Sequence, residues 1–152
     1  MLNQIYFKEI LIVIFFSSFF SISHAQDIFL SLKKNKVNVR YGPSFESSIK
    51  FIYKKINLPI KQIDKKENWR RIIDLKNNSG WIHSSQLKPI NSIIPLTDKI
   101  LFNKPSKFSQ PLAKIEKGRV LFLEKCEMEW CKIKTDKFKG WIKTDNIWGL
   151  IK

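Results

Sequence analysis

The amino-acid sequence predicts an all-β protein built from two tandem small barrels that follow an N-terminal signal peptide. Three observations predict this architecture: a duplicated tryptophan motif, short apolar runs, and few helix signals after residue 25. The first copy of the motif reads Trp69-Arg70-Arg71-Ile72 and then Gly80-Trp81-Ile82. The second reads Trp130-Cys131-Lys132-Ile133 and then Gly140-Trp141-Ile142. Matched placement of such a bulky residue indicates a repeat of one small domain.

The apolar runs give the expected strands and the domain limits. Runs of four to eight residues between turn residues are typical of small barrels and sandwiches. We expect strands within residues 58–63, 68–75 and 80–83, with a hairpin turn at 64–68, and again within 120–125, 130–134 and 140–143. Residues 89–97 contain two prolines, which interrupt strand pairing, and therefore predict a linker between domains 30–88 and 98–152.

Residues 1–25 have the pattern of a signal peptide. An apolar run from Ile10 to Phe20 is followed by Ser23 and Ala25, the small residues that signal peptidase reads. The run is shorter than the roughly 20 apolar residues of a membrane-spanning helix. We expect cleavage between Ala25 and Gln26, a periplasmic or secreted chain, and no integral membrane span after cleavage. The alternative is an uncleaved N-terminal anchor.

The only two cysteines, Cys126 and Cys131, lie five residues apart. In an oxidising compartment this spacing predicts a disulfide across a tight hairpin, stabilising the fold by about 2 kcal/mol. The alternatives are a redox pair or half of a metal site. His83 is the only histidine after residue 25, and a second pair of thiols is absent. We therefore expect neither a metal nor a cofactor.

The composition is strongly basic, with a formal charge of +15 at pH 7 and a large excess of Lys over Arg. Such a charge attracts polyanions. The alternative is a general compositional bias, since Ile and Asn are abundant as well. An exported chain meets anionic envelope polymers before nucleic acid, so nucleic acid is not an expected partner.

Catalytic chemistry finds little support in the sequence. A cysteine peptidase needs a thiolate with a histidine base, and the thiols here are expected to be oxidised. A glycosidase needs two carboxylates across a cleft, whereas Glu124, Glu127 and Glu129 cluster near one hairpin tip. We therefore expect a protein that is not an enzyme.

The first copy resembles the bacterial SH3-like domain. The similarity lies in Asn38-Val39-Arg40-Tyr41-Gly42-Pro43, then Trp69, then Gly80-Trp81-Ile82. The second copy departs from this pattern at Lys104, which replaces the turn glycine and would fit poorly at a position of positive φ. The resemblance implies partly open barrels of five or six strands, two per chain, and a non-catalytic role in the cell envelope, often near peptidoglycan.

The candidate ligand-binding residues are Arg40, Tyr41, Trp69, Arg70 and Arg71, all in the first copy. Arginine can hold a carboxylate or phosphate with two parallel hydrogen bonds, which lysine cannot do. One alternative is that Trp69 and Trp81 fill the barrel core. Another is that the arginines act internally, for instance by pairing Arg71 with Asp74 or by hydrogen bonds to carbonyl oxygens that pin a loop. We expect Trp148 to close the second core.

The sequence thus predicts a binding protein whose ligand is peptidoglycan or an envelope partner protein. A scaffolding domain pair and electrostatic adhesion to anionic polymers are the alternatives. Binding is expected in the first domain, with the second mainly structural. The oligomeric state stays open.

Overall fold

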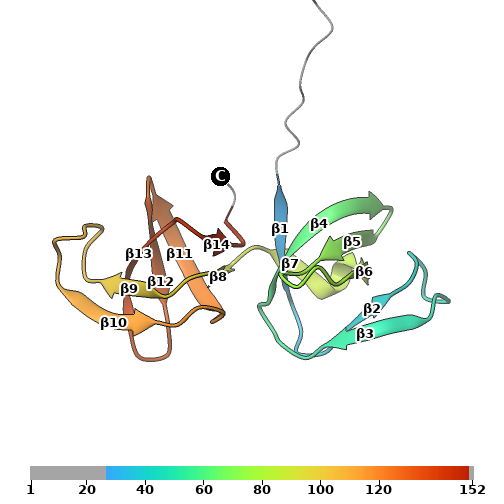
Figure 1. Ribbon diagram of the computed structural model, residues 1–152. Helices are drawn as coiled ribbons and strands as arrows, with labels where there is room; N and C mark the ends of the chain where they lie inside the picture. Colours follow the sequence, from blue (N-terminus) through green and yellow to red (C-terminus); the bar gives the residue numbers. More distant parts are fainter. Residues whose placement is uncertain (1–26, 151–152) are drawn as a thin grey trace, which may run out of the picture.

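A computed structural model describes residues 27–150 and shows two β-sheet units joined by a short connection (Figure 1). The predicted signal peptide and its cleavage site lie outside the described residues. The first unit contains β1 (Ile28–Leu32), β2 (Val37–Arg40), β3 (Ile49–Tyr53), β4 (Pro59–Lys66), β5 (Trp69–Ile73), β6 (Ser79–His83) and β7 (Leu87–Pro89). The second contains β8 (Ser92–Pro95), β9 (Lys99–Phe102), β10 (Pro111–Ile115), β11 (Leu121–Glu127), β12 (Trp130–Lys134), β13 (Lys139–Lys143) and β14 (Ile147–Trp148).

Each unit is one seven-stranded antiparallel sheet, and both sheets have the same strand order. The order is β3-β2-β6-β5-β4-β1-β7 in the first unit and β10-β9-β13-β12-β11-β8-β14 in the second. The prediction of an all-β fold with two tandem small barrels is confirmed, with seven strands in place of the five or six expected. The one short helix in residues 27–150, η2 (Ser84–Gln86), is a single 3-10 turn. Within that range we find no helix with the length and apolar character needed to cross a bilayer.

Aliphatic side chains fill the inside of each barrel. The first core consists of Leu32, Val37, Val39, Ile60, Ile72, Ile82 and Leu87. The second consists of Ile93, Leu101, Ile115, Leu121, Cys131, Ile133 and Ile142. Each core takes its central members from alternate positions of its strands, as the period of two in a β-strand requires.

The repeated glycine of the Gly-Trp-Ile motif lies where two strands approach closely. A Cβ atom at Gly80 would come within 2.9 Å of the Arg40 carbonyl oxygen, and one at Gly140 within 2.5 Å of the Phe102 carbonyl oxygen. Any larger side chain would push β6 away from β2, and β13 away from β9. The glycine of the motif therefore allows the close approach of β6 to β2 and of β13 to β9.

Trp81 is half-buried on the outer face of the first sheet, so the interpretation that it fills the core is wrong, whereas Trp69 is buried but lies outside the aliphatic cluster. Ile82 points inward, so its neighbours Trp81 and His83 face outward. Trp69 lies opposite His83 and shares this outer face. It is still only 7% exposed, because side chains outside the barrel cover it.

The segment expected to be a linker contains a strand. Within residues 89–97, β8 pairs with β11 and with β14 and so belongs to the second sheet. Pro89 and Pro95 are the last residues of β7 and β8, so their missing N–H groups do not interrupt the pairing. Only Ile90 and Asn91 separate the two sheets.

The turn that contains Gly42 in the first barrel, and Lys104 in the second, does not need a left-handed residue. Neither residue has positive φ. A Cβ atom at Gly42 would instead approach the Ser47 hydroxyl to 2.7 Å. The expectation that Lys104 disturbs this turn is wrong, because glycine is favoured at position 42 by a local side-chain contact.

The two barrels share a polar and aromatic interface. The indole Nε1 of Trp148 donates to the carbonyl oxygen of Pro59 in the first barrel at 2.9 Å, and its ring packs edge-on against Phe29. The buried hydroxyls of Ser31 and Ser92 lie 3.0 Å apart across the same junction. Trp148 thus joins the two domains, and the expectation that it closes the second core is wrong.

The predicted disulfide between Cys126 and Cys131 is confirmed. The two residues are direct partners across the β11–β12 hairpin, with 4.1 Å between their Cα atoms. This is near the close spacing of a non-hydrogen-bonded antiparallel pair.

Candidate functional site

A row of residues crosses the outer face of the first sheet. Arg40 on β2 pairs with Trp81 on β6, which pairs with Arg71 on β5, which pairs with Asp64 on β4. Directly opposed residues of antiparallel strands project to the same face. The Trp81 side chain therefore lies between two arginines that are 31 residues apart in the sequence.

Arg40, Trp81 and Arg71 of this row, but not Asp64, line a pocket of about 270 Å³. Its lining consists of Arg40, Tyr41, Lys50, Arg71, Ser79, Gly80 and Trp81. Three of these side chains are cationic and none is acidic, while Tyr41 and Trp81 supply aromatic surface. The pocket surface is therefore mainly polar and positively charged, with a smaller aromatic part, which suits an anion.

Arg40 and Lys50 are held in place by backbone oxygens. Arg40 donates from Nη1 to the carbonyl oxygen of Ser47 at 2.6 Å, and Lys50 donates from Nζ to that of Ser79 at 3.0 Å. The Lys50 ammonium also lies 5.5 Å from the Tyr41 ring centroid, within the range of a cation–π contact. These contacts fix two cations at the pocket before any ligand arrives.

Arg71 is exposed, and it makes no hydrogen bond or ion pair with the residues that the structure describes. The internal pair expected between Arg71 and Asp74 does not form. Asp74 instead accepts hydrogen bonds from the Tyr53 hydroxyl at 3.0 Å and from Asn78. Burial raises the pKa of Tyr53 strongly, and the negative charge of Asp74 raises it further. The Arg71 guanidinium is therefore available to a ligand.

An aromatic cluster lies on the same face of the sheet. The ring of Trp69 contacts Phe45 at 5.0 Å and His83 at 5.2 Å between centroids, both edge-on. The Arg40 guanidinium lies 5.9 Å from the centroid of Phe45, which is 63% exposed. Phe45 thus covers Trp69 and connects it to the pocket.

Of the five predicted site residues, Arg40, Tyr41 and Arg71 come together in the pocket, and Trp69 lies beside them. Arg70 does not join them, because alternation along β5 turns it to the opposite face. Its Nη1 donates to the carbonyl oxygens of Glu67 and Trp69, which pins the hairpin turn.

Sequence reasoning did not select Lys50 or Phe45. In the sequence Lys50 resembles the many other lysines of this chain, and its contacts with the Ser79 carbonyl oxygen and the Tyr41 ring appear only in the structure. Phe45 follows Pro43-Ser44 in a turn, and an aromatic residue in a polar turn was a usable signal.

The second barrel presents a different surface at the matching positions. Phe102 and Lys132 take the places of Arg40 and Arg71 beside Trp141. The ammonium groups of Lys125 and Lys132 lie 5.3 and 5.8 Å from the Trp141 ring. Two lysine side chains cover this indole, which is only 7% exposed. Between residues 27 and 150 neither barrel groups His, Cys, Asp or Glu side chains in a way that could hold a metal ion.

Comparison with known proteins gives two findings. The chain is similar to two solved structures, of NlpC2 and of NlpC1 from Trichomonas vaginalis, each with 12% sequence identity and a TM-score of 0.38. The matches cover 83% and 84% of this chain, which spans about half the length of those proteins (49% and 47%). Comparison with curated protein sequences gave no match.

The sequence profile described as "Bacterial SH3 domain" matches residues 33–89 and again residues 99–149. These two matches cover most of β2 to β7 and of β9 to β14, and so agree with the two sheets of the fold. The chain therefore belongs to the bacterial SH3 domain family and carries two copies of the domain in tandem.

Proposed function

We propose that this protein is a non-catalytic binding protein of the cell envelope that recognises peptidoglycan through the first barrel. The observation that carries the proposal is the pocket that places Arg40, Lys50 and Arg71 around Trp81. Membership in the bacterial SH3 domain family and the disulfide, which favours an oxidising compartment, support a periplasmic location.

The chemistry of the pocket matches an acidic peptide. A carboxylate can accept two parallel hydrogen bonds from Arg71, while Arg40 and Lys50 add positive charge nearby. Trp81 and Tyr41 give an apolar surface for the adjoining part of the ligand. The peptides of the bacterial wall combine free carboxylates with small apolar side chains, and so fit both features.

An envelope protein with an acidic segment is the second candidate ligand. The exposed Phe45 and Tyr41 favour it, because exposed aromatic rings beside arginine are typical of protein interfaces. Adhesion to anionic polymers without a pocket is the third candidate. Ionic strength separates adhesion from the other two, because screening shortens the Debye length to about 3 Å at 1 M salt.

The test is sedimentation of residues 26–152 with purified peptidoglycan sacculi at 0.1 M and 0.5 M salt. We expect Arg71→Gln to weaken binding about tenfold or more, as expected for loss of a hydrogen bond to a charged group. Lys132→Gln is the matched control, since Lys132 occupies the equivalent position in the second barrel. It should bind like the parent.

Equal weakening by both variants, together with loss of binding at 0.5 M salt, would show diffuse adhesion. Absence of binding to sacculi at 0.1 M salt would contradict the peptidoglycan proposal. Crosslinking of cells that carry the parent or Arg71→Gln would then test for an envelope partner protein.

A further inference from the structure

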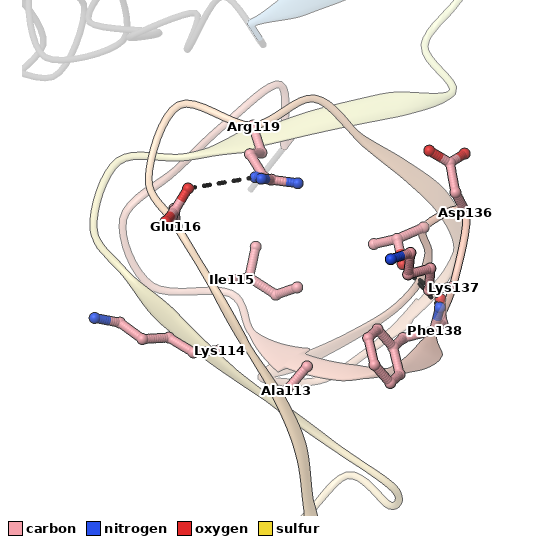
Figure 2. Close-up of a pocket in the computed structure, with 9 residues that line it drawn as sticks. Ala113, Lys114, Ile115, Glu116, Arg119, Asp136, Lys137 and Phe138 are labelled. Atoms are coloured by element: carbon pink, nitrogen blue, oxygen red, sulfur yellow. Dashed lines mark hydrogen bonds and ion pairs between the residues drawn. The ribbon is translucent and has the colours of Figure 1, made fainter.

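The second barrel contains a cavity of about 330 Å³ that the candidate site does not include (Figure 2). It lies between the end of β10 and the loop that joins β12 to β13. Ala113 and Ile115 line one side of it, and Phe138 with Lys137 lines the other (Figure 2). A volume of this size is at the lower end of the range for small-molecule sites.

The cavity exists because two large side chains of the first barrel have small counterparts here. Phe51 and Tyr53 on β3 occupy the register positions that Ala113 and Ile115 occupy on β10. In the first barrel the two rings contact each other at 5.2 Å and pack against the core. Replacing two aromatic rings by a methyl group and a butyl group leaves space at the same place in the second barrel.

The loop that closes this region in the first barrel has also changed. There the Tyr53 hydroxyl donates to Asp74, which ties the β5–β6 loop to β3. The equivalent loop residue in the second barrel is Thr135, whose hydroxyl bonds with Phe138 of its own loop. The loop is thus held by bonds within itself and, among residues 27–150, has no side-chain hydrogen bond to β10.

Arg119, the one arginine among residues 93–152, lines this cavity. Its Nε lies 3.6 Å from a carboxylate oxygen of Glu116, and its terminal nitrogens have no hydrogen-bond partner among residues 27–150. Figure 2 shows the guanidinium above Ile115, with a dashed line to Glu116. Lys114 and Lys137 also line the cavity, together with the carboxylates of Glu116 and Asp136, so its cationic side chains outnumber its acidic ones by three to two.

We propose that this cavity binds the C-terminal end of a short peptide that ends in an apolar residue. The terminal carboxylate accepts hydrogen bonds from the two terminal nitrogens of Arg119. The apolar side chain of the last peptide residue lies against Ala113 and Ile115. The geometry matches the two parallel hydrogen bonds that arginine makes with a carboxylate. The site is separate from the Arg71 pocket, so the test of this proposal does not depend on the test of the proposed function.

The test uses N-acetyl-leucine as the probe and N-acetyl-leucinamide as the matched ligand without a carboxylate. Binding is followed in the full mature chain by shifts of the backbone amide signals in two-dimensional NMR spectra. We expect saturable shifts at residues 113–119 and 135–138, with a dissociation constant of about 1 mM for a ligand of this size. The amide ligand should cause shifts at least tenfold smaller.

Two variants locate the site. Arg119→Gln, at an exposed position, should weaken binding about tenfold, and Lys117→Gln, an exposed neighbour outside the cavity lining, should not. The double variant Ala113→Phe with Ile115→Tyr restores the first-barrel residues and should abolish binding. If that variant fails to fold, the comparison of Arg119→Gln with Lys117→Gln tests the proposal without it. Absence of shifts up to 10 mM, equal shifts with the amide, or equal losses in both single variants would overturn the proposal.

Discussion

Lys99 carries a charged group into the second barrel, where its side chain is only 7% exposed. Its Nζ donates to the Asp145 carboxylate at 2.8 Å and to the Asp145 carbonyl oxygen at 2.5 Å. This hydrogen bond, assisted by the positive charges of Lys99 and Lys143, lowers the pKa of Asp145 below its usual value. A buried ammonium needs such partners, because desolvation of an unpaired charge costs several kcal/mol.

A pH dependence of stability follows from the lowered pKa of Asp145. As the pH falls below about 4, the Asp145 carboxylate is protonated in the unfolded chain before it is protonated in the folded one. The stability that its interaction with Lys99 contributes is therefore present above that pH and is lost below it. We expect Asp145→Asn to lower the free energy of unfolding at pH 7 by about 1 kcal/mol. The variant should also lose less stability than the parent between pH 5 and 3. Part of the loss remains, because the pKa values of Asp98 and Glu124 are lowered as well.

Thermal unfolding at several pH values measures this effect. Asp136→Asn is the control, because Asp136 is exposed and makes no ion pair within residues 27–150. An unchanged pH slope in Asp145→Asn would contradict the linkage.

Among the secondary-structure elements, the β4–β5 and β11–β12 hairpins show how the two copies diverged. Glu67 and Met128 begin the two turns and both have positive φ. Two residues before each turn residue, the first barrel pairs Lys65 with Arg70, and the second pairs Cys126 with Cys131. The disulfide thus replaces a basic pair at one position of an otherwise similar hairpin.

Removal of this disulfide should cost about 2 kcal/mol, because it closes a loop of only a few residues. We expect the double variant Cys126→Ser with Cys131→Ala to unfold at lower denaturant concentration by that amount. Thiol labelling of the denatured, unreduced parent should find no free thiol. A reductant should destabilise the parent and leave the double variant unchanged, and a reductant effect on the variant would assign the change to another cause.

At the scale of the whole molecule, the two barrels pack through buried polar groups and Trp148. Ser31 and Ser92 are fully buried, and the Ser92 hydroxyl also donates to the Asn57 carbonyl oxygen of the first barrel. Gly149, at φ +93°, lets the chain pass beside Pro59. Buried groups that hydrogen-bond across a junction predict that the two domains unfold together.

Trp148→Phe removes the indole donor to Pro59 and retains an aromatic ring against Phe29. We expect it to lower stability by about 1 kcal/mol and Trp148→Ala by more. Calorimetry should show one unfolding transition in the parent and two in Trp148→Ala. Trp130→Phe, at a half-buried ring that contacts Phe102 of the same domain, is the control and should keep a single transition. Two transitions already in the parent would show that the domains unfold independently.

The local pattern of the sequence was sufficient for the fold class, for most strands and for the disulfide. A repeat of Trp-x-x-Ile and Gly-Trp-Ile marks two copies, and strands and hairpins depend on residues near one another in the chain. The cysteines were predictable because their pairing needs only one hairpin. Of the candidate site, Arg40 and Tyr41 were found as members of the motif that opens the domain, and Arg71 as a member of the repeated segment that begins at Trp69.

Only the tertiary structure decided which face of each strand is inside. On β5, Trp69 and Ile73 alternate with Arg70 and Ile72, so both faces carry apolar residues and alternation alone does not identify the core. The curvature of the sheet selects Ile72, which places Arg70 apart from Arg71. Trp148 was assigned to the wrong contact because its partners, Pro59 and Phe29, lie in the other barrel. The cavity beside Ala113 likewise depends on which strand faces the β12–β13 loop, since contacts between distant segments arise only when the sheet closes.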